Sequence, residues 1–155
     1  MQSIILNILL VAVIIIPMAY FMFGNKKNSD VISAFKKKAG DQSLSPNEIC
    51  SLSHVTIGSD SKSKTLCWMN TKSGDFHSIP FSELSDVTVS KSYQNHMIHG
   101  TETGTLSGVA LSLHKKDKKD VAITVFNEAD GHPVGNDLLD VTEFVNKIKK
   151  SNLLA

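Results

Sequence analysis

Arginine is missing from this chain of 155 residues, and all sixteen basic residues are lysine. Arginine is the residue that most often forms paired hydrogen bonds with phosphate, carboxylate or guanine. Its absence argues against sequence-specific recognition of DNA and against an active site built around an arginine clamp. The formal net charge is only +1. We therefore expect no nucleic-acid partner from bulk electrostatics either.

Cysteine is also scarce, since the chain contains only Cys50 and Cys67. Their spacing lacks the closely paired ligands of a zinc site. In a reducing compartment both are expected to be free thiols, and free cysteines are often simply buried. If the domain faces an oxidising compartment instead, the two become a candidate disulfide.

Signatures of catalysis are absent as well. There is no Gly-x-Ser-x-Gly elbow, and the stretch Gly100–Gly104 lacks the Gly-Lys-Ser/Thr of a phosphate loop. His96 and His99, with Glu102 nearby, form the only histidine cluster. In a loop or strand, their spacing places the two imidazoles on opposite faces. We expect no enzyme, no cofactor and no metal site, and we expect Trp68 to serve the core rather than a ligand.

What the sequence does contain is a long apolar run at its N-terminus. From Ile4 to Phe23 no residue is charged, and a helix of roughly 20 apolar residues is long enough to cross a bilayer. No basic residue precedes the run and no Ala-x-Ala ends it, unlike a cleaved signal peptide. Residues 1–24 are therefore predicted to be a retained transmembrane anchor, which is also a candidate contact for homo-oligomers.

Lysines follow the apolar run and predict its orientation. Lysine-rich flanks stay on the cytoplasmic side, so we expect a single-pass inner (plasma) membrane protein with its N-terminus outside and its C-terminal domain in the cytoplasm. The same lysines are candidate membrane-surface residues, because each contributes about 1 kcal/mol near anionic lipid. Within residues 25–47, the alternative is that they only set the topology while a short helix at 31–39 packs on the domain. The residues concerned are Lys26, Lys27, Lys36, Lys37 and Lys38.

Residues 48–152 are predicted to form one β domain that ends in a helix. Apolar residues alternate in short segments separated by turn signals, which is typical of an antiparallel meander. The stretch 91–105 is mostly polar, and Gly58–Ser63 is predicted to be a turn. From Asn136 or Asp137 the period becomes helical, and Leu138, Val141, Val145 and Ile148 are predicted to form one apolar stripe. The predicted strands are 49–57, 64–70, 76–81, 84–89, a short one near 97–101, 106–114 and 120–126.

About seven short antiparallel strands followed by one amphipathic helix resemble the pleckstrin-homology-like fold. The segment Ile79–Val89 is similar to a stretch of small bacterial membrane-anchored proteins of this type, and Asp120–Asn127 matches the usual ending. The resemblance implies a β-sandwich or barrel closed by the C-terminal helix. The chain departs from the phosphoinositide-binding members, because Lys62 and Lys64 stand in their hairpin without an arginine.

The functional expectation is a membrane-anchored, non-catalytic interaction or adaptor module that binds an unknown protein partner. Two alternatives remain open. One is an exported pilin-like structural subunit, although the chain lacks the glycine and glutamate that pilins carry at the apolar run. The other is a domain that binds anionic lipid.

Overall fold

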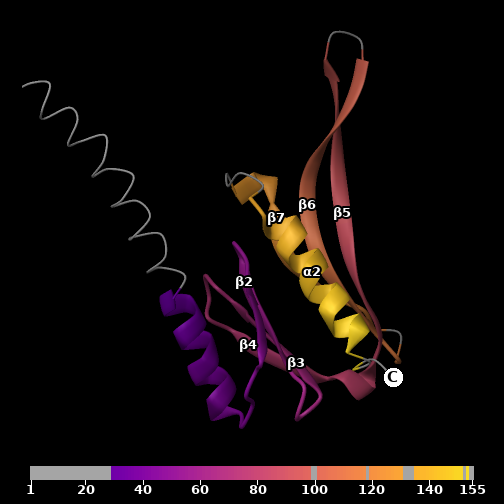
Figure 1. Ribbon diagram of the computed structural model, residues 1–155. Coiled ribbons are helices and arrows are strands. Elements are labelled where there is room, and N and C mark those ends of the chain that lie inside the picture. The colour runs from indigo at the N-terminus through magenta and orange to yellow at the C-terminus, as the bar shows by residue number, and fades with distance from the viewer. Residues whose placement is uncertain (1–28, 99–100, 118, 131–134, 152, 154–155) are drawn as a thin grey trace, which may run out of the picture.

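Figure 1 shows the computed structural model, which describes residues 29–98, 101–117, 119–130, 135–151 and 153. The expected anchor at residues 1–24, together with Lys26 and Lys27, lies outside these residues. Within the described residues, no helix is both long and apolar enough to cross a membrane.

Seven strands form two antiparallel sheets, each a simple meander. The first sheet has the order β1-β2-β3-β4 and the second the order β5-β6-β7. A C-terminal helix, α2 (Asp137–Lys150), contacts β1 of the first sheet and both β5 and β7 of the second. The predicted antiparallel β-sandwich with a C-terminal helix is confirmed at this level. The strands are β1 (Glu48–Ser51), β2 (Val55–Asp60), β3 (Thr65–Asn70), β4 (Phe76–Pro80), β5 (Leu84–Ile98), β6 (Thr101–Lys115) and β7 (Val121–Asn127).

In the first sheet, the strand boundaries differ from the prediction mainly in two places. The predicted strand 49–57 is a hairpin, because the chain reverses at Leu52, whose amide donates to the carbonyl of Val55 (2.9 Å). The predicted turn at 58–63 was placed too early, because Gly58 lies inside β2. The glycine is therefore not part of the turn, and its missing side chain makes room for Phe35 of the neighbouring helix.

The main core lies between the two sheets and α2. Side chains from the inner faces of both sheets meet one apolar face of the helix, on which Val141, Phe144, Val145 and Ile148 are buried. The predicted stripe is therefore the buried face, except that Leu138 is only partly buried. The chain passes from the first sheet to the second at a 3-10 turn, η1 (Phe81–Glu83), where Phe81 is 1% exposed.

A helix at residues 29–41 covers the outer face of the first sheet. Phe35 and Ala39 are fully buried, and Phe35 packs in a second cluster with Cys67 and Met69 of β3. With the main core on one face and this helix on the other, all six residues of β2 are buried. The interpretation of this segment as a helix packed on the domain agrees with these contacts.

The longest feature is the ribbon formed by β5 and β6. The two strands pair from Leu84 with Lys115 out to Ile98 with Thr101. Figure 1 shows the distal half of this ribbon projecting away from the other elements. The expectation of only a short strand near 97–101 within the polar stretch 91–105 was wrong, because β5 continues to Ile98 and β6 begins at Thr101. The stretch is mostly polar in sequence and therefore carries no clear period-two signal.

Candidate functional site

A cleft of about 750 Å³ opens between the inner face of the first sheet and β7 of the second. Val55 and Trp68 contribute apolar surface from the first sheet, and Val121 and Ile123 contribute it from β7. Polar side chains from β3, β4 and the following turns surround this surface. A concave site with apolar walls and a few polar groups is the usual form of a binding site.

Trp68 and His77 form the wall of the cleft on the first sheet. They are cross-strand partners in β3 and β4, and their rings stack with centroids 5.4 Å apart and an interplanar angle of 29°. Trp68 is partly buried against the main core, whereas His77 is exposed. Trp68 therefore packs against the core, as expected, and the same side chain also lines the cleft.

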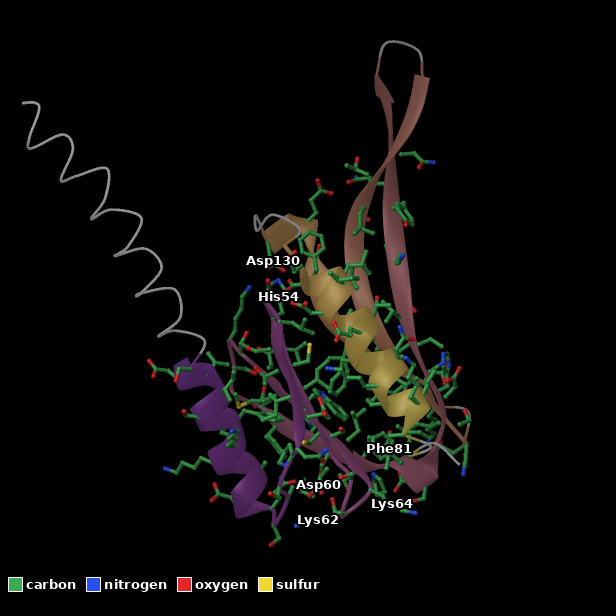
Figure 2. All side chains as sticks on the ribbon, in the orientation of Figure 1. His54, Asp60, Lys62, Lys64, Phe81 and Asp130 are labelled. Atoms are coloured by element: carbon green, nitrogen blue, oxygen red, sulfur yellow. The ribbon has the colours of Figure 1, made fainter. Side chains whose placement is uncertain are left out.

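One end of the cleft is crossed by a histidine–carboxylate contact and a lysine–carboxylate ion pair between the two sheets. Asp130, in the short turn η2 (Glu128–Asp130) after β7, lies 3.3 Å from the Nε2 of His54 and 3.2 Å from the Nζ of Lys72. The His54 side chain is 8% exposed and that of Asp130 is 34% exposed. Figure 2 shows His54 and Asp130 side by side at this end. The pairs fix the spacing of the sheets where the cleft closes.

The free edge of β7 borders the other side of the cleft. Among the described residues β7 pairs only with β6, in the register Gly108–Asn127 to Leu113–Val121. Ala122 and Thr124 are exposed along β7 and line the cleft. A strand edge with unpaired backbone groups is a template for pairing with a further extended chain.

The predicted membrane-surface lysines do not approach this cleft. Lys36, Lys37 and Lys38 are exposed on the helix at 29–41. The Nζ of Lys38 donates to the carbonyl oxygen of Gly74 in the turn between β3 and β4. Lys36 and Lys37 remain on a helix whose apolar face is already occupied by the sheet.

The turn between β2 and β3, which carries Lys62 and Lys64, is organised around a carboxylate. Asp60 is 2% exposed and accepts hydrogen bonds from the backbone amides of Ser45 (2.8 Å), Lys62 (2.9 Å) and Ser63 (3.2 Å). Burial alone would raise the pKa of this carboxyl, but the amide donors outweigh it and hold the pKa below the ordinary value of 3.8. These backbone amides already donate to Asp60 and are therefore not available to bind an anionic lipid headgroup.

The two cysteines lie on opposite faces of the first sheet and are both free. Cys50 packs against the main core, and Cys67 belongs to the cluster under the helix at 29–41. The alternative of a disulfide between them is therefore wrong for this fold. Burial, with Asp140 and Asp137 next in importance, raises the pKa of Cys50 to about 12, and burial with Asp60 raises that of Cys67 to about 12.

The side chains of the histidine cluster, His96, His99 and Glu102, lie outside the described part of the structure. His99 lies outside the described residues, while the backbone positions of His96 and Glu102 fall in β5 and β6 opposite Thr103 and Met97. In the part of the chain that the structure describes, no group of three or more His, Cys, Asp or Glu side chains could hold a metal ion.

A second histidine makes a hydroxyl–imidazole–carboxylate chain that the sequence did not reveal. His114 lies 2.9 Å from the Oγ1 of Thr88 through Nε2 and 2.8 Å from the Oδ2 of Asp120 through Nδ1. The three side chains come from β5, from β6 and from the residue just before β7, and they do not line the cleft. We interpret the chain as a cross-strand network that ties the second sheet together.

Comparison with known proteins adds no relative: no family model, no curated protein and no solved structure matches the chain.

Proposed function

We propose that this protein is a membrane-tethered, non-catalytic interaction module that binds an extended segment of another protein along the free edge of β7. The observation that carries the proposal is the coincidence of that edge with the cleft. A strand added to β7 lies over Trp68 and His77. The backbone of β7 supplies affinity and the cleft supplies side-chain selection, as in other cases of strand addition.

The fold proposed for this module is pleckstrin-homology-like. The support is the arrangement of a four-stranded and a three-stranded meander in succession, with the last helix touching both sheets. The tether is proposed from the apolar run at residues 4–23 and the lysines that follow it. The same lysines place the module on the cytoplasmic side of the inner membrane in this proposal.

Site-specific photo-crosslinking in cells tests the proposal. A photoreactive amino acid at Ala122 or Thr124 lies at an exposed position of β7 that borders the cleft, whereas one at Asp117 occupies an exposed position in the turn between β6 and β7. We expect a discrete adduct from the two β7 positions that is absent from the Asp117 position. The substitution Trp68→Ala should remove the adduct, because the bound segment loses its aromatic wall.

The identity of the captured segment provides the second half of the test. A synthetic peptide covering it should compete for crosslinking at Ala122 and should shift the amide resonances of β7. Equal adducts at Asp117 and Ala122, or adducts that survive Trp68→Ala unchanged, would contradict the proposal.

We also propose that Lys36 and Lys37 lie against anionic lipid. The specific support is that the helix at 29–41 uses its apolar face for packing and leaves these two lysines exposed. A fragment of residues 29–155 should bind vesicles containing phosphatidylserine more tightly than neutral vesicles at low salt. Lys36→Gln/Lys37→Gln should remove that difference, whereas Lys116→Gln, in the turn between β6 and β7, should not.

A further inference from the structure

The cleft contains a carboxylate that no cation of the described residues neutralises. Asp75 and Asp130 are the two acidic residues that line the cleft. Asp130 contacts both His54 and Lys72. Asp75 accepts a hydrogen bond from the hydroxyl of Ser73, but among the described residues it forms no ion pair within 4.0 Å. A cationic group of a bound molecule can therefore pair with Asp75.

Asp75 lies next to His77 on the wall of the cleft. It immediately precedes β4, and its carbonyl oxygen accepts a hydrogen bond from the amide of Asn70 at the end of β3 (3.0 Å). Phe76, between the two, packs against Phe35 on the outer face of the first sheet. Because side chains alternate along a strand, Asp75 and His77 share the opposite face, where both line the cleft.

The lysines beside this turn are engaged elsewhere. The Nζ of Lys72 lies 3.2 Å from Asp130, and the Nζ of Lys38 donates to the carbonyl oxygen of Gly74. Lys72 is the one lysine among the residues that line the cleft, against the two carboxylates of Asp75 and Asp130. The charge of the cleft therefore favours a positively charged group over a negative one.

We propose that the segment bound in the cleft presents a basic side chain, arginine above all, to Asp75 and His77. This inference rests on the strand binding along β7 proposed above and names the chemistry of the bound segment. A guanidinium group lies flat on the ring of His77, which stacks on Trp68, and donates to the carboxylate of Asp75. Lysine has the same charge but lacks the flat surface, and an acidic side chain meets repulsion from Asp75.

Apolar side chains belong on either side of the basic residue. The cleft carries apolar surface from Val55 and Trp68 on the first sheet and from Ile123 on β7. Side chains two positions apart in an extended segment share a face and are separated by about 7 Å. The face of the segment that enters the cleft is therefore expected to read apolar, basic, apolar at alternate positions.

Capped pentapeptides of the sequence Val-Thr-Xaa-Thr-Val test this preference on the full-length protein in nonionic detergent micelles. Xaa is arginine, lysine, glutamate or citrulline, which keeps the shape of arginine without its charge. Trp68 is the only tryptophan of the chain, so tryptophan fluorescence reports binding at the cleft. The arginine peptide should bind about fivefold or more tightly than the citrulline peptide, with lysine between them and glutamate weakest.

Substitutions at Asp75 identify the carboxylate responsible. Asp75→Asn should make the arginine and citrulline peptides bind alike, and retained affinity for the citrulline peptide shows that the cleft is intact. Asp75→Lys should reverse the order, so that the glutamate peptide binds more tightly than the arginine peptide. Asp117→Asn, at an exposed position in the turn between β6 and β7, is the matched control and should keep the wild-type order.

The outcomes separate this inference from the strand binding on which it rests. Equal binding of the arginine and citrulline peptides by the wild type would overturn the basic preference and leave strand binding along β7 intact. A preference for arginine that persists in both Asp75→Asn and Asp75→Lys would overturn the role of Asp75 in the same way. A fluorescence signal that responds to none of the peptides would contradict the strand binding itself, and this inference with it.

Discussion

The ring of Phe35 lies directly over the α-carbon of Gly58. A β-carbon at position 58 would stand 2.9 Å from two ring atoms of Phe35 and 3.0 Å from the Cβ of Pro46. Phe35 is fully buried at this point. The contact joins the helix at 29–41 to the middle of β2, so the glycine determines how closely the helix approaches the sheet.

Gly58→Ala should therefore destabilise a fragment of residues 29–155 by about 1–3 kcal/mol, the usual cost of overpacking a filled core. Urea denaturation measures the change. Gly40→Ala is the matched control, because a β-carbon there meets nothing within 4 Å. In this helix the control should be neutral or slightly stabilising. Equal effects of the two substitutions would mean that the helix does not pack on β2.

The lowered pKa of Asp60 should make the free energy of unfolding depend on pH in the acid range. Its pKa in the folded protein lies below the ordinary value of 3.8. The unfolded chain therefore binds the proton more readily, and the stabilisation is fully present above the unfolded pKa and is lost as the pH falls through the folded pKa. Asp60→Asn should cost about 2 kcal/mol near neutral pH, because the bonds to a charged acceptor are lost.

The free energies of unfolding of Asp60→Asn and the wild type should differ less in acid, because the carboxyl of Asp60 then becomes protonated in the wild type. Urea denaturation of the fragment across the acid range measures both curves. Asp41→Asn, at an exposed position, is the control and should run parallel to the wild type. A constant gap between Asp60→Asn and the wild type at every pH would show that the charge is not what stabilises the turn.

Elements with one buried face were predictable from the sequence, and elements that depend on distant contacts were not. β7 and α2 each carry a clear period, and the structure places them within a few residues of the prediction. The ribbon was missed because the stretch 91–105 is mostly polar in sequence and carries no period-two signal. Gly58 was assigned to a turn because the ring that needs it, Phe35, lies far away in the sequence.

The cleft could not be predicted, because it exists only where the two sheets meet. Trp68 was expected to serve the core, whereas its partners across the cleft come from β7 and η2, more than fifty positions later. The pairing of His54 with Asp130 likewise depends on how the sheets are arranged. Hydrophobic periodicity reveals a strand or a helix because it repeats every few residues. It contains no information about residues that become neighbours only when distant elements pack together.

The cysteines should resist thiol reagents for as long as the domain is folded. Both pKa values are raised to about 12 by burial first of all, so the reactive thiolate is rare at neutral pH. Iodoacetamide labelling of the 29–155 fragment, read by mass spectrometry, should be slow in buffer and fast in urea. Cys50, which is only half-buried, should react before Cys67.

A thiol introduced by Lys116→Cys is the reference for that measurement, because position 116 is exposed. It should react many times faster than either native cysteine. Native thiols that react as fast as this reference would contradict the packing of helix 29–41 and α2 on the two faces of the first sheet.

A substitution at Val145 tests whether α2 closes the core between the two sheets. It is 5% exposed, on the face of α2 that meets both sheets. Val145→Asp places an unpaired carboxylate among apolar side chains, which costs several kcal/mol of the roughly 5–15 kcal/mol that stabilise a domain of this size. Burial also raises the pKa of the new carboxyl, so the loss should grow as the pH rises above about 4.

The control has to be an exposed position with few charged neighbours. Lys147 is unsuitable, because its Nζ lies 3.3 Å from Glu143 and 3.9 Å from Glu48. Asn146 is exposed and precedes the three lysines of the last turn, so Asn146→Asp should change the free energy of unfolding by less than about 0.5 kcal/mol. Urea denaturation of both variants of the 29–155 fragment makes the comparison. If Val145→Asp were tolerated as well as Asn146→Asp, α2 would not close the core, and the cleft between β3 and β7 would lose its structural support.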